Sequence, residues 1–180
     1  MRIRRATRRD ANGIARVHAE SWRTTYATML PDTYLDQLRI RSLAREWRRT
    51  IETRHTIVAV ETDGKREHVV GFAQLGRGRS QNPEWRRMLG EIHMLYVEPE
   101  RQSDGVGGAL LRASMRALEQ SNMMWMHVWV LEDNLSARRF YERHGLQADG
   151  RSRIDRFHGQ QVRVVRYARA LNSLWEAVVR

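Results

Sequence analysis

The sequence predicts an α+β fold, in which a mixed sheet of about seven strands carries helices on its faces. Short runs rich in β-branched and aromatic residues alternate with longer stretches whose apolar residues recur at helical spacing. A strand–helix–strand unit in the middle of the chain requires a right-handed crossover. The chain has 180 residues, which suits one domain. We therefore expect a single domain over residues 1–170, followed by a helical tail over residues 171–180.

The first part of the chain is predicted to hold one strand and several helices. A short strand over residues 3–6 comes first, and the helix after it presents Ile14, Val17 and His18 on one face. Aromatic residues then gather around Pro31, where we expect a helix end, a turn and a second helix. Another helical stretch follows before the second strand.

Strands dominate the rest of the chain. They are predicted over residues 56–61, 69–75, 91–97, 123–131, 146–154 and 161–170, with a loop over residues 76–83 and a turn at residues 157–159. Asp63-Gly64 is a hairpin signal between the first two of these strands. One helix begins near Gly105, and a second is capped by Asn134 and ends at Gly145.

The composition removes several classes of site. The chain has no cysteine, which excludes disulfides, thiolate metal sites and a cysteine nucleophile. No apolar run approaches the roughly 20 residues of a membrane span. The basic N-terminus lacks the apolar stretch of a signal peptide. We therefore expect a cytoplasmic protein with no membrane partner.

The net charge of +11 comes almost wholly from arginine, since Lys65 is the single lysine. A basic balance is typical of proteins that bind nucleic acid or anionic ligands. The arginines are scattered, with no run of five or six, which favours a solvated surface over nucleic-acid binding. A groove that binds a polyphosphate ligand would account for part of the excess positive charge.

The stretch from Glu91 to Leu111 is the most informative part of the sequence. Its strand, over residues 91–97, is stopped by Pro99, and a polar, glycine-rich turn over residues 102–108 precedes a helix. Such a turn exposes unpaired backbone N–H groups at the positive end of a helix dipole, which suits phosphate. A glycine-rich helix start with no ligand is the alternative.

Two common phosphate loops do not fit this turn. A Walker A loop needs a lysine followed by Ser or Thr, which the turn lacks, and a dinucleotide fingerprint needs a glycine where Leu110 stands. What remains is Gln102-x-x-Gly105-x-Gly107. This pattern resembles the pyrophosphate loop of the GCN5-related N-acetyltransferase (GNAT) family.

A second segment supports the resemblance. Val128-x-Val130-x-x-x-Asn134-x-x-Ala137-x-x-Phe140-Tyr141-x-x-x-Gly145-Leu146 looks like the family's strand-plus-helix segment. It follows the glycine turn after one helix and one strand, as in the family. Both motifs in this order make a coincidence improbable.

The resemblance covers roughly residues 1–170 and implies the GNAT fold. In that fold a mostly antiparallel sheet of about seven strands contains a splayed pair, here the strands at residues 91–97 and 123–131. The resemblance implies an acetyl-CoA-dependent N-acetyltransferase that moves an acetyl group to a primary amine of a small molecule or peptide. Without cysteine, we expect direct transfer in a ternary complex. No cluster of His, Asp and Glu has metal spacing, so no metal is expected.

The resemblance also implies which residues hold acetyl-CoA. The strand backbone pairs with the pantetheine arm like an added strand, and the turn holds the pyrophosphate. The implied contacts are Leu95, Tyr96, Val97, Gln102, Ser103, Asp104, Gly105, Val106, Gly107, Gly108, Asn134 and Tyr141. Asp104 stands where the family commonly has a basic residue, so we expect the turn to bind more through N–H groups than through side-chain charge. Asn134 is equally well explained as a helix cap.

Acetyl transfer needs a base for the amine and a proton for the departing thiolate. The resemblance gives Tyr141 the role of general acid, since a phenol can donate to a thiolate. Packing beside Phe140 is the alternative role of Tyr141. Glu91 is the candidate general base and His93, two residues further along the strand, is the second candidate. His127, on the next strand, ranks behind both.

No motif in the sequence identifies the acceptor amine, but Trp22, Tyr26 and Asp32 are expected to contact it. Alternatives within enzymes are transfer of a larger acyl group and acetylation of a protein N-terminus. A non-catalytic CoA-binding regulator and an arginine-rich nucleic-acid-binding protein are alternatives of other classes. The sequence leaves a homodimer open.

Overall fold

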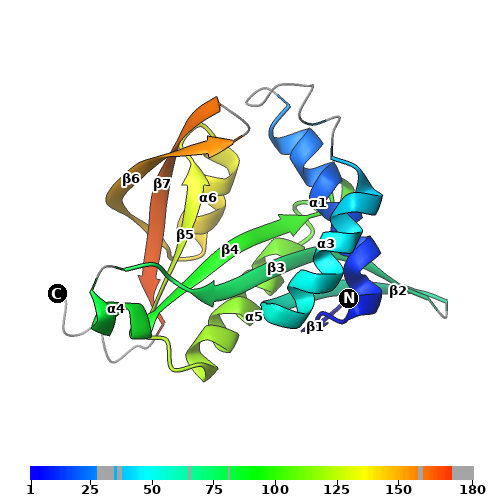
Figure 1. Cartoon of the computed structure of the whole chain (residues 1–180), viewed down its shortest axis with the longest axis horizontal. Coiled ribbons are helices and arrows are strands. Elements are labelled where there is room, and N and C mark those ends of the chain that lie inside the picture. Colours follow the sequence, from blue (N-terminus) through cyan, green and yellow to red (C-terminus); the bar gives the residue numbers. More distant parts are fainter. Residues whose placement is uncertain (28–34, 36–37, 65, 81, 158–159, 172–180) are drawn as a thin grey trace. The chain divides into compact units, whose positions relative to one another are not determined.

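The structure is a computed structural model that describes residues 1–27, 35, 38–64, 66–80, 82–157 and 160–171 of the chain (Figure 1). Three predictions fall outside these ranges. They are the helical tail after residue 171, the turn at residues 158–159, and the segment around Pro31 with the expected substrate contact Asp32.

Seven strands form one sheet, in the order β1-β2-β3-β4-β5-β7-β6. Their bounds are β1 Arg2–Arg5, β2 His55–Asp63, β3 Arg66–Arg77, β4 Leu89–Val97, β5 Trp125–Leu131, β6 Gln147–Phe157 and β7 Gln160–Ala170. β4 and β5 are parallel, whereas β1 with β2, β5 with β7 and β6 with β7 are antiparallel. The predicted mixed, mostly antiparallel sheet is therefore confirmed.

The helices in Figure 1 are α1 Ala11–Thr25, α3 Ile40–Thr53, α4 Pro83–Met88, α5 Val106–Gln120 and α6 Leu135–Arg143. Two 3-10 turns, η1 Arg8–Asp10 and η2 Pro99–Arg101, precede α1 and α5. The sequence predicts a loop through residues 76–83, but β3 continues to Arg77 and α4 begins at Pro83. Within the described ranges, no helix has the length and apolar character that a membrane crossing requires.

The chain clusters into two compact units. The first comprises residues 1–74 and 94–114, and the second comprises residues 75–93 and 115–180. The expectation of a single domain over residues 1–170 stays a prediction.

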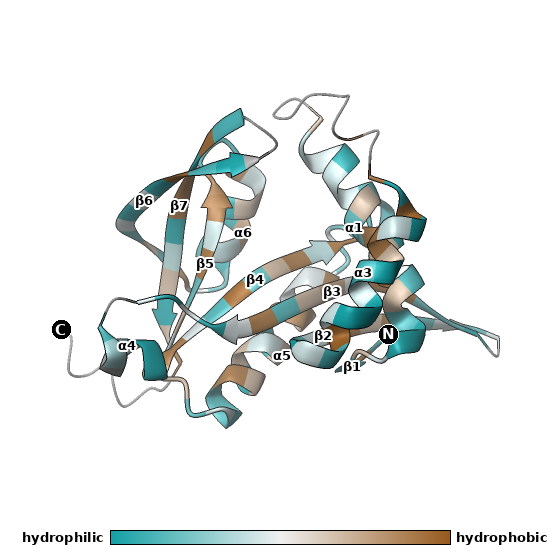
Figure 2. Ribbon diagram, viewed as in Figure 1, coloured by the Kyte–Doolittle hydropathy of each residue, from teal (hydrophilic) through white to brown (hydrophobic). Residues whose placement is uncertain are grey.

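The core of the first unit is apolar and includes one face of α1 and one of α3. Its buried cluster consists of Ala6, Ala11, Ile14, Ala15, Val17, Ala44, Trp47, Ile51, Val58, Val60, Val69 and Phe72. Ile14 and Val17 belong to the helical face that the sequence predicts. Figure 2 shows hydrophobic colour in the middle of β3 and much hydrophilic colour on α3, as expected of a core strand and an amphipathic helix.

The second unit is built on β5, β7 and β6, with α6 held against β7. Tyr167 of β7 is fully buried, and its hydroxyl donates to Glu142 of α6 at 2.7 Å. Arg138, also on α6, donates from Nε to the same hydroxyl at 3.1 Å. This network fixes the helix that carries Tyr141.

Candidate functional site

The predicted phosphate turn lies in the first unit, between η2 and α5. Ser103 and Gly105 have positive φ angles of 69° and 80°, a backbone conformation that glycine adopts without steric cost. Residues 102–105 are exposed, and a Cβ on Gly105 would meet no atom within 4 Å. At the start of α5 the Ala109 N–H donates to the Gly105 carbonyl at 3.0 Å, and helix geometry leaves the preceding N–H groups without an intrahelical acceptor. The turn therefore fits an anion such as pyrophosphate.

Arg101 pairs with the acidic residue of the turn. Its Nε contacts the Asp104 carboxylate at 2.9 Å, and its guanidinium also pairs with Glu61. These contacts, first with Glu61 and then with Asp104, raise the pKa of Arg101 above its usual range. The charge of Asp104 is thus compensated within the turn, so an anion can approach the backbone N–H groups.

Gly71 of β3 lets the start of α5 pack closely on the sheet. A Cβ at this position would lie 3.0 Å from Leu110 Cδ1 and from the Tyr96 carbonyl, and 3.2 Å from Val106 Cγ1. These contacts are tighter than ordinary van der Waals distances, so only glycine fits without a shift. Sequence reasoning missed Gly71, because a single glycine in a strand does not reveal which helix approaches it.

An aromatic cluster surrounds Tyr96, one of the implied acetyl-CoA contacts on β4. The Tyr96 ring stacks on His18, with centroids 5.6 Å apart and planes 12° apart. Tyr26 lies 3.5 Å from Tyr96 between hydroxyl oxygens, and Trp22 packs edge-on against Tyr26 at 5.0 Å. The first unit thus brings the expected substrate contacts Trp22 and Tyr26 to the strand that the resemblance assigns to acetyl-CoA.

Two polar groups beside this cluster already have partners. The Ser21 hydroxyl donates to the Val97 carbonyl at 2.9 Å, so that carbonyl would be shared if it also paired with a ligand. The Trp47 indole N–H donates to His18 Nδ1 at 3.3 Å. Burial lowers the pKa of His18 to about 4, which keeps this imidazole neutral near pH 7. His18 is therefore a core histidine.

The second unit holds Tyr141 and Asn134, at opposite ends of α6. Asn134 Oδ1 accepts from the Ala137 N–H at 3.0 Å, which confirms the predicted cap. Tyr141 is buried between Phe140 and Tyr167, at ring distances of 5.1 and 6.4 Å. Its packing role is therefore present, and its role as general acid stays a prediction. The same holds for Asn134 as an acetyl-CoA contact.

Glu91 of β4 lies between two imidazoles. Its Oε1 is 3.2 Å from Nδ1 of His93, and its Oε2 is 3.2 Å from Nε2 of His127. His127 is brought here by the parallel pairing of β4 and β5, in which Glu91 and His127 are register partners. Burial alone would raise the pKa of Glu91, but its interactions with His127 and His93 lower it to about 2. Glu91 is therefore ionised at neutral pH.

Two glycines at the end of β3 make room for these imidazoles. A Cβ on Gly76 would lie 2.6 Å from Nε2 of His93, and a Cβ on Gly78 would lie 2.6 Å from Cε1 of His127. Any larger residue would displace a ring. The sequence shows the spacings Gly76-x-Gly78 and Glu91-x-His93, but it does not show that the two segments face each other.

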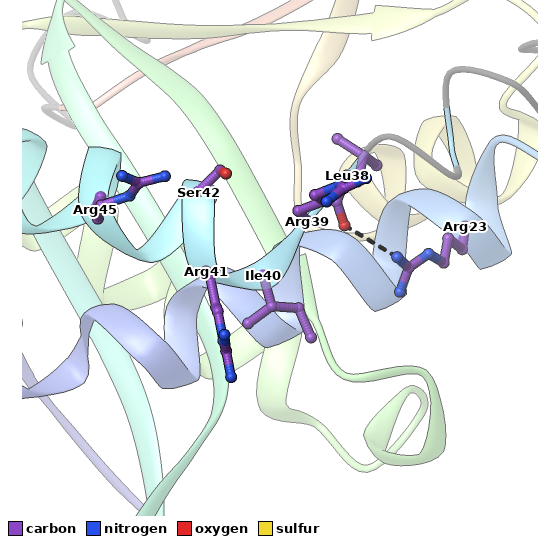
Figure 3. Close-up of a pocket in the computed structure, with 7 residues that line it drawn as sticks. All are labelled: Arg23, Leu38, Arg39, Ile40, Arg41, Ser42 and Arg45. Atoms are coloured by element: carbon purple, nitrogen blue, oxygen red, sulfur yellow. Dashed lines mark hydrogen bonds between the residues drawn. The ribbon is translucent and has the colours of Figure 1, made fainter.

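A cavity of about 420 Å³ opens where α1 ends and α3 begins, in the first unit (Figure 3). Its lining residues are Arg23, Leu38, Arg39, Ile40, Arg41, Ser42 and Arg45. Arg23 reaches across from α1 and donates to the Leu38 carbonyl at 3.0 Å, as the dashed line in Figure 3 marks. Four guanidinium groups line it, and no carboxylate does so among the described residues, a balance that favours an anionic ligand. We refer to this cavity as the arginine pocket.

No metal centre accompanies these groups in the part of the chain that the structure describes. There, no three His, Asp or Glu side chains form a group that could hold a metal ion. In the group formed by Glu91, His93 and His127, which we call the Glu91 cluster, both imidazoles face the carboxylate rather than a common point. The expectation of a metal-independent reaction stays a prediction.

The sequence is similar to known proteins over most of its length. A family model described as "Acetyltransferase (GNAT) family" matches residues 15–146. The protein named "Uncharacterized N-acetyltransferase YuaI", from Bacillus subtilis (strain 168), is 36% identical over 134 residues, which cover 74% of this chain and 73% of that protein. A protein named "Uncharacterized N-acetyltransferase", from Archaeoglobus fulgidus, is 31% identical over 147 residues, which cover 82% of this chain and 93% of that protein.

A solved structure shares the fold. The PaiA N-acetyltransferase from Thermoplasma acidophilum, crystallised in complex with coenzyme A, aligns with a TM-score of 0.66. The alignment covers 92% of this chain and 96% of that chain at 19% sequence identity. At this identity the likeness concerns the fold alone, and it agrees with the mixed sheet described above.

Proposed function

The chain belongs to the acetyltransferase (GNAT) family of acyl-CoA-dependent N-acetyltransferases, and from this premise we propose that it moves an acetyl group from acetyl-CoA to a primary amine of a small molecule or peptide. The transfer is direct, in a ternary complex, in the cytoplasm. The amine nitrogen forms a bond to the thioester carbonyl carbon, and the carbon–sulfur bond breaks. The amine gives up one proton, and the leaving thiolate takes one.

The observation that carries this proposal is the exposed turn at the start of α5. Its positive-φ residues Ser103 and Gly105 turn the backbone ahead of a helix N-terminus, which is the geometry of a phosphate site. Gly71 lets that helix end pack closely on the sheet, and Arg101 compensates Asp104. The complex of the Thermoplasma acidophilum enzyme with coenzyme A supports the choice of donor.

The proton transfers are assigned to the second unit. Tyr141 is the general acid for the leaving thiolate, and its burial on α6 gives the phenol a fixed position. A base on β4 takes the proton of the amine, with Glu91 as the first candidate and His93 as the second. The ionised carboxylate of Glu91 can orient a hydrogen-bond donor, whereas its lowered pKa makes it a weak base near neutral pH.

The acceptor is proposed to carry an anionic group besides its amine. The arginine pocket supports this choice, because four guanidinium groups line a cavity of about 420 Å³. Trp22, on the helix that also carries Arg23, and Tyr26, directly after that helix, supply an aromatic surface beside Tyr96. Amino acids and acidic peptides have this combination of groups.

The proposal is tested by thiol release from acetyl-CoA against a panel of primary amines, with acidic amino acids and acidic peptides beside neutral and cationic amines. We expect amine-dependent thiol release, with the acetylated amine identified by mass spectrometry. Thiol release that no amine stimulates would contradict the proposal. Preference for a cationic amine would overturn the anionic acceptor while leaving acetyl transfer in place.

A further inference from the structure

β6 is an edge strand, because the strand order of the sheet ends with β5-β7-β6. One edge of β6 pairs with β7, and no described strand pairs with its other edge. In Figure 1, β6 lies outside β7 within the second unit. Such an edge presents a row of backbone N–H and C=O groups that a further strand can bind.

The second half of β6 is the regular part of this edge. The pairing with β7 shifts register between Ala148 and Ser152, whereas residues 152–157 pair with β7 without a break. In the middle of that stretch Ile154 is 51% exposed, between Arg153 and Asp155. Successive side chains of a strand alternate between its faces, so Arg153 and Asp155 share the face opposite to that of Ile154. The regular edge therefore carries one exposed apolar residue flanked by a cation and an anion.

A second copy of the chain can pair with this edge in only a few ways. Two identical antiparallel strands are related by a two-fold axis, so that residue i faces residue j and j faces i. Residues that face each other directly point to the same side of the sheet. The axis must therefore pass through a residue and not between two residues. The residue on the axis fixes the register, and with it every pair of facing side chains.

The charges of β6 select one of these registers. Among residues 152–156, an axis through any residue other than Ile154 opposes two like charges, namely Arg153 with itself, Asp155 with itself, Arg156 with itself, or Arg151 with Arg153. Like charges that face each other directly destabilise a strand pair, whereas opposite charges stabilise it. An axis through Ile154 brings the two isoleucines together and places each Arg153 opposite Asp155 of the partner subunit.

Arg153 is held in a position that suits this contact. Its Nε lies 2.8 Å from Oδ1 of Asp155 in the same chain, and its Nη2 donates to Oδ2 at 2.9 Å. The guanidinium lies over the ring of Trp129, 4.2 Å from the ring centroid. A guanidinium has five N–H donors, so others remain for a second carboxylate. Two copies can therefore form a group of alternating charges without breaking the pair within each chain.

We propose that two copies of the chain associate through β6, in an antiparallel strand pair whose two-fold axis passes through Ile154. Backbone hydrogen bonds join the two edges, and the exposed isoleucine of each copy covers that of the other. Two Arg153–Asp155 contacts between the subunits fix the register. The partner is a second copy rather than an unrelated peptide, because the charges of this edge complement themselves. The association is independent of the proposed acetyl transfer.

Disulfide capture tests the register directly, because the chain has no cysteine of its own. In the proposed pair the Cα atoms at position 154 face each other at about 4.5–5.5 Å, within the reach of a disulfide. Those at position 156 lie four residues apart along the strand, roughly 13 Å. We expect mild oxidation to convert Ile154→Cys into a disulfide-linked dimer on a non-reducing gel and to leave Arg156→Cys monomeric. Equal cross-linking of the two variants, or none in Ile154→Cys, would overturn the proposal.

Sedimentation equilibrium tests the charge pairs without a cysteine. We expect Arg153→Asp and Asp155→Arg each to raise the dissociation constant of the dimer at least about 10-fold, because each opposes two like charges twice in the pair. The double exchange, Arg153→Asp with Asp155→Arg, should return the constant to near that of the wild type. Leu135→Asp is the matched control, because Leu135 is 55% exposed on α6, and it should leave the constant unchanged.

Two outcomes of the sedimentation experiment would overturn the proposal. One is a wild-type protein that stays monomeric at its highest soluble concentration. The other is a double exchange that associates no better than the single variants. Circular dichroism verifies that each variant is folded, and the cysteine capture does not depend on the charged side chains of Arg153 and Asp155.

Discussion

Replacing Gly78 with alanine should disturb the Glu91 cluster through a single methyl group. The added Cβ would lie 2.6 Å from Cε1 of His127 and 2.7 Å from Cγ of Leu89. Both residues are buried, at 1% and 8% exposure, so neither side chain can turn into solvent. Such overpacking costs about 1–3 kcal/mol of unfolding free energy. For a protein of this size that corresponds to a Tm lower by roughly 2–12 °C.

Thermal unfolding and histidine nuclear magnetic resonance measured together separate this effect from general loss of stability. Gly150→Ala is the matched control, because Gly150 has φ of +77° and no atom within 4 Å of a Cβ. This control should lower the unfolding free energy by about 1–2 kcal/mol, because alanine is strained at a positive φ, and it should leave the His127 resonances unshifted. Gly78→Ala should shift them. A Gly78→Ala protein with wild-type Tm and wild-type His127 signals would refute the packing described here.

Three further substitutions test other parts of the account. Asn134→Ala removes the cap of α6 and should lower the unfolding free energy by about 0.5–2 kcal/mol in chemical denaturation. Asn134→Asp keeps an accepting side chain and should be close to wild type. Equal stability of the wild type and both variants would show that the cap does not stabilise the protein. Tyr141→Phe removes only the hydroxyl and should lower kcat by about 10²–10⁴-fold when chemistry limits the rate, so full turnover would remove Tyr141 as general acid. Glu91→Gln should cost up to about 3 kcal/mol near neutral pH. Because the folded protein lowers the pKa of Glu91 from 4.5 to about 2, this contribution is present above pH 4.5 and fades as the pH falls toward 2. A difference in unfolding free energy between wild type and Glu91→Gln that grows as the pH falls would contradict this prediction.

Features set by local chemistry could be predicted from the sequence. The cap at Asn134 follows from a side chain that accepts from the N–H three residues later. Gly64 and Gly145 have φ of +59° and +78°, as the hairpin signal and the helix stop require. The order of strands and helices could also be predicted, because each of these elements shows its own hydrophobic periodicity in the sequence.

Features set by distant pairing could not be predicted. The partnership of Glu91 with His127 depends on the register between two parallel strands, which the intervening helix leaves undefined in the sequence. His127 therefore ranked behind Glu91 and His93 as a candidate base. The contact of His127 with Glu91 becomes visible only when the register, the burial of His127 and the position of Gly78 are known together.

Two other features could not be predicted from the sequence, for physical reasons. α4 has six residues, too few to show helical periodicity, and its start depends on Asn82 accepting from the Trp85 N–H at 3.3 Å. The arginine pocket combines Arg23 of α1 with residues around the start of α3. In the sequence these arginines are indistinguishable from the scattered surface charge.

The most direct test of the account follows the backbone amide resonances of the wild-type protein during a titration with coenzyme A. The central claim is that the turn before α5 holds the pyrophosphate of the acetyl donor. It predicts that the amides of residues 105–109 shift most strongly and saturate together at micromolar ligand. Binding that leaves these amides unmoved, or the absence of any shift at saturating ligand, would contradict the claim.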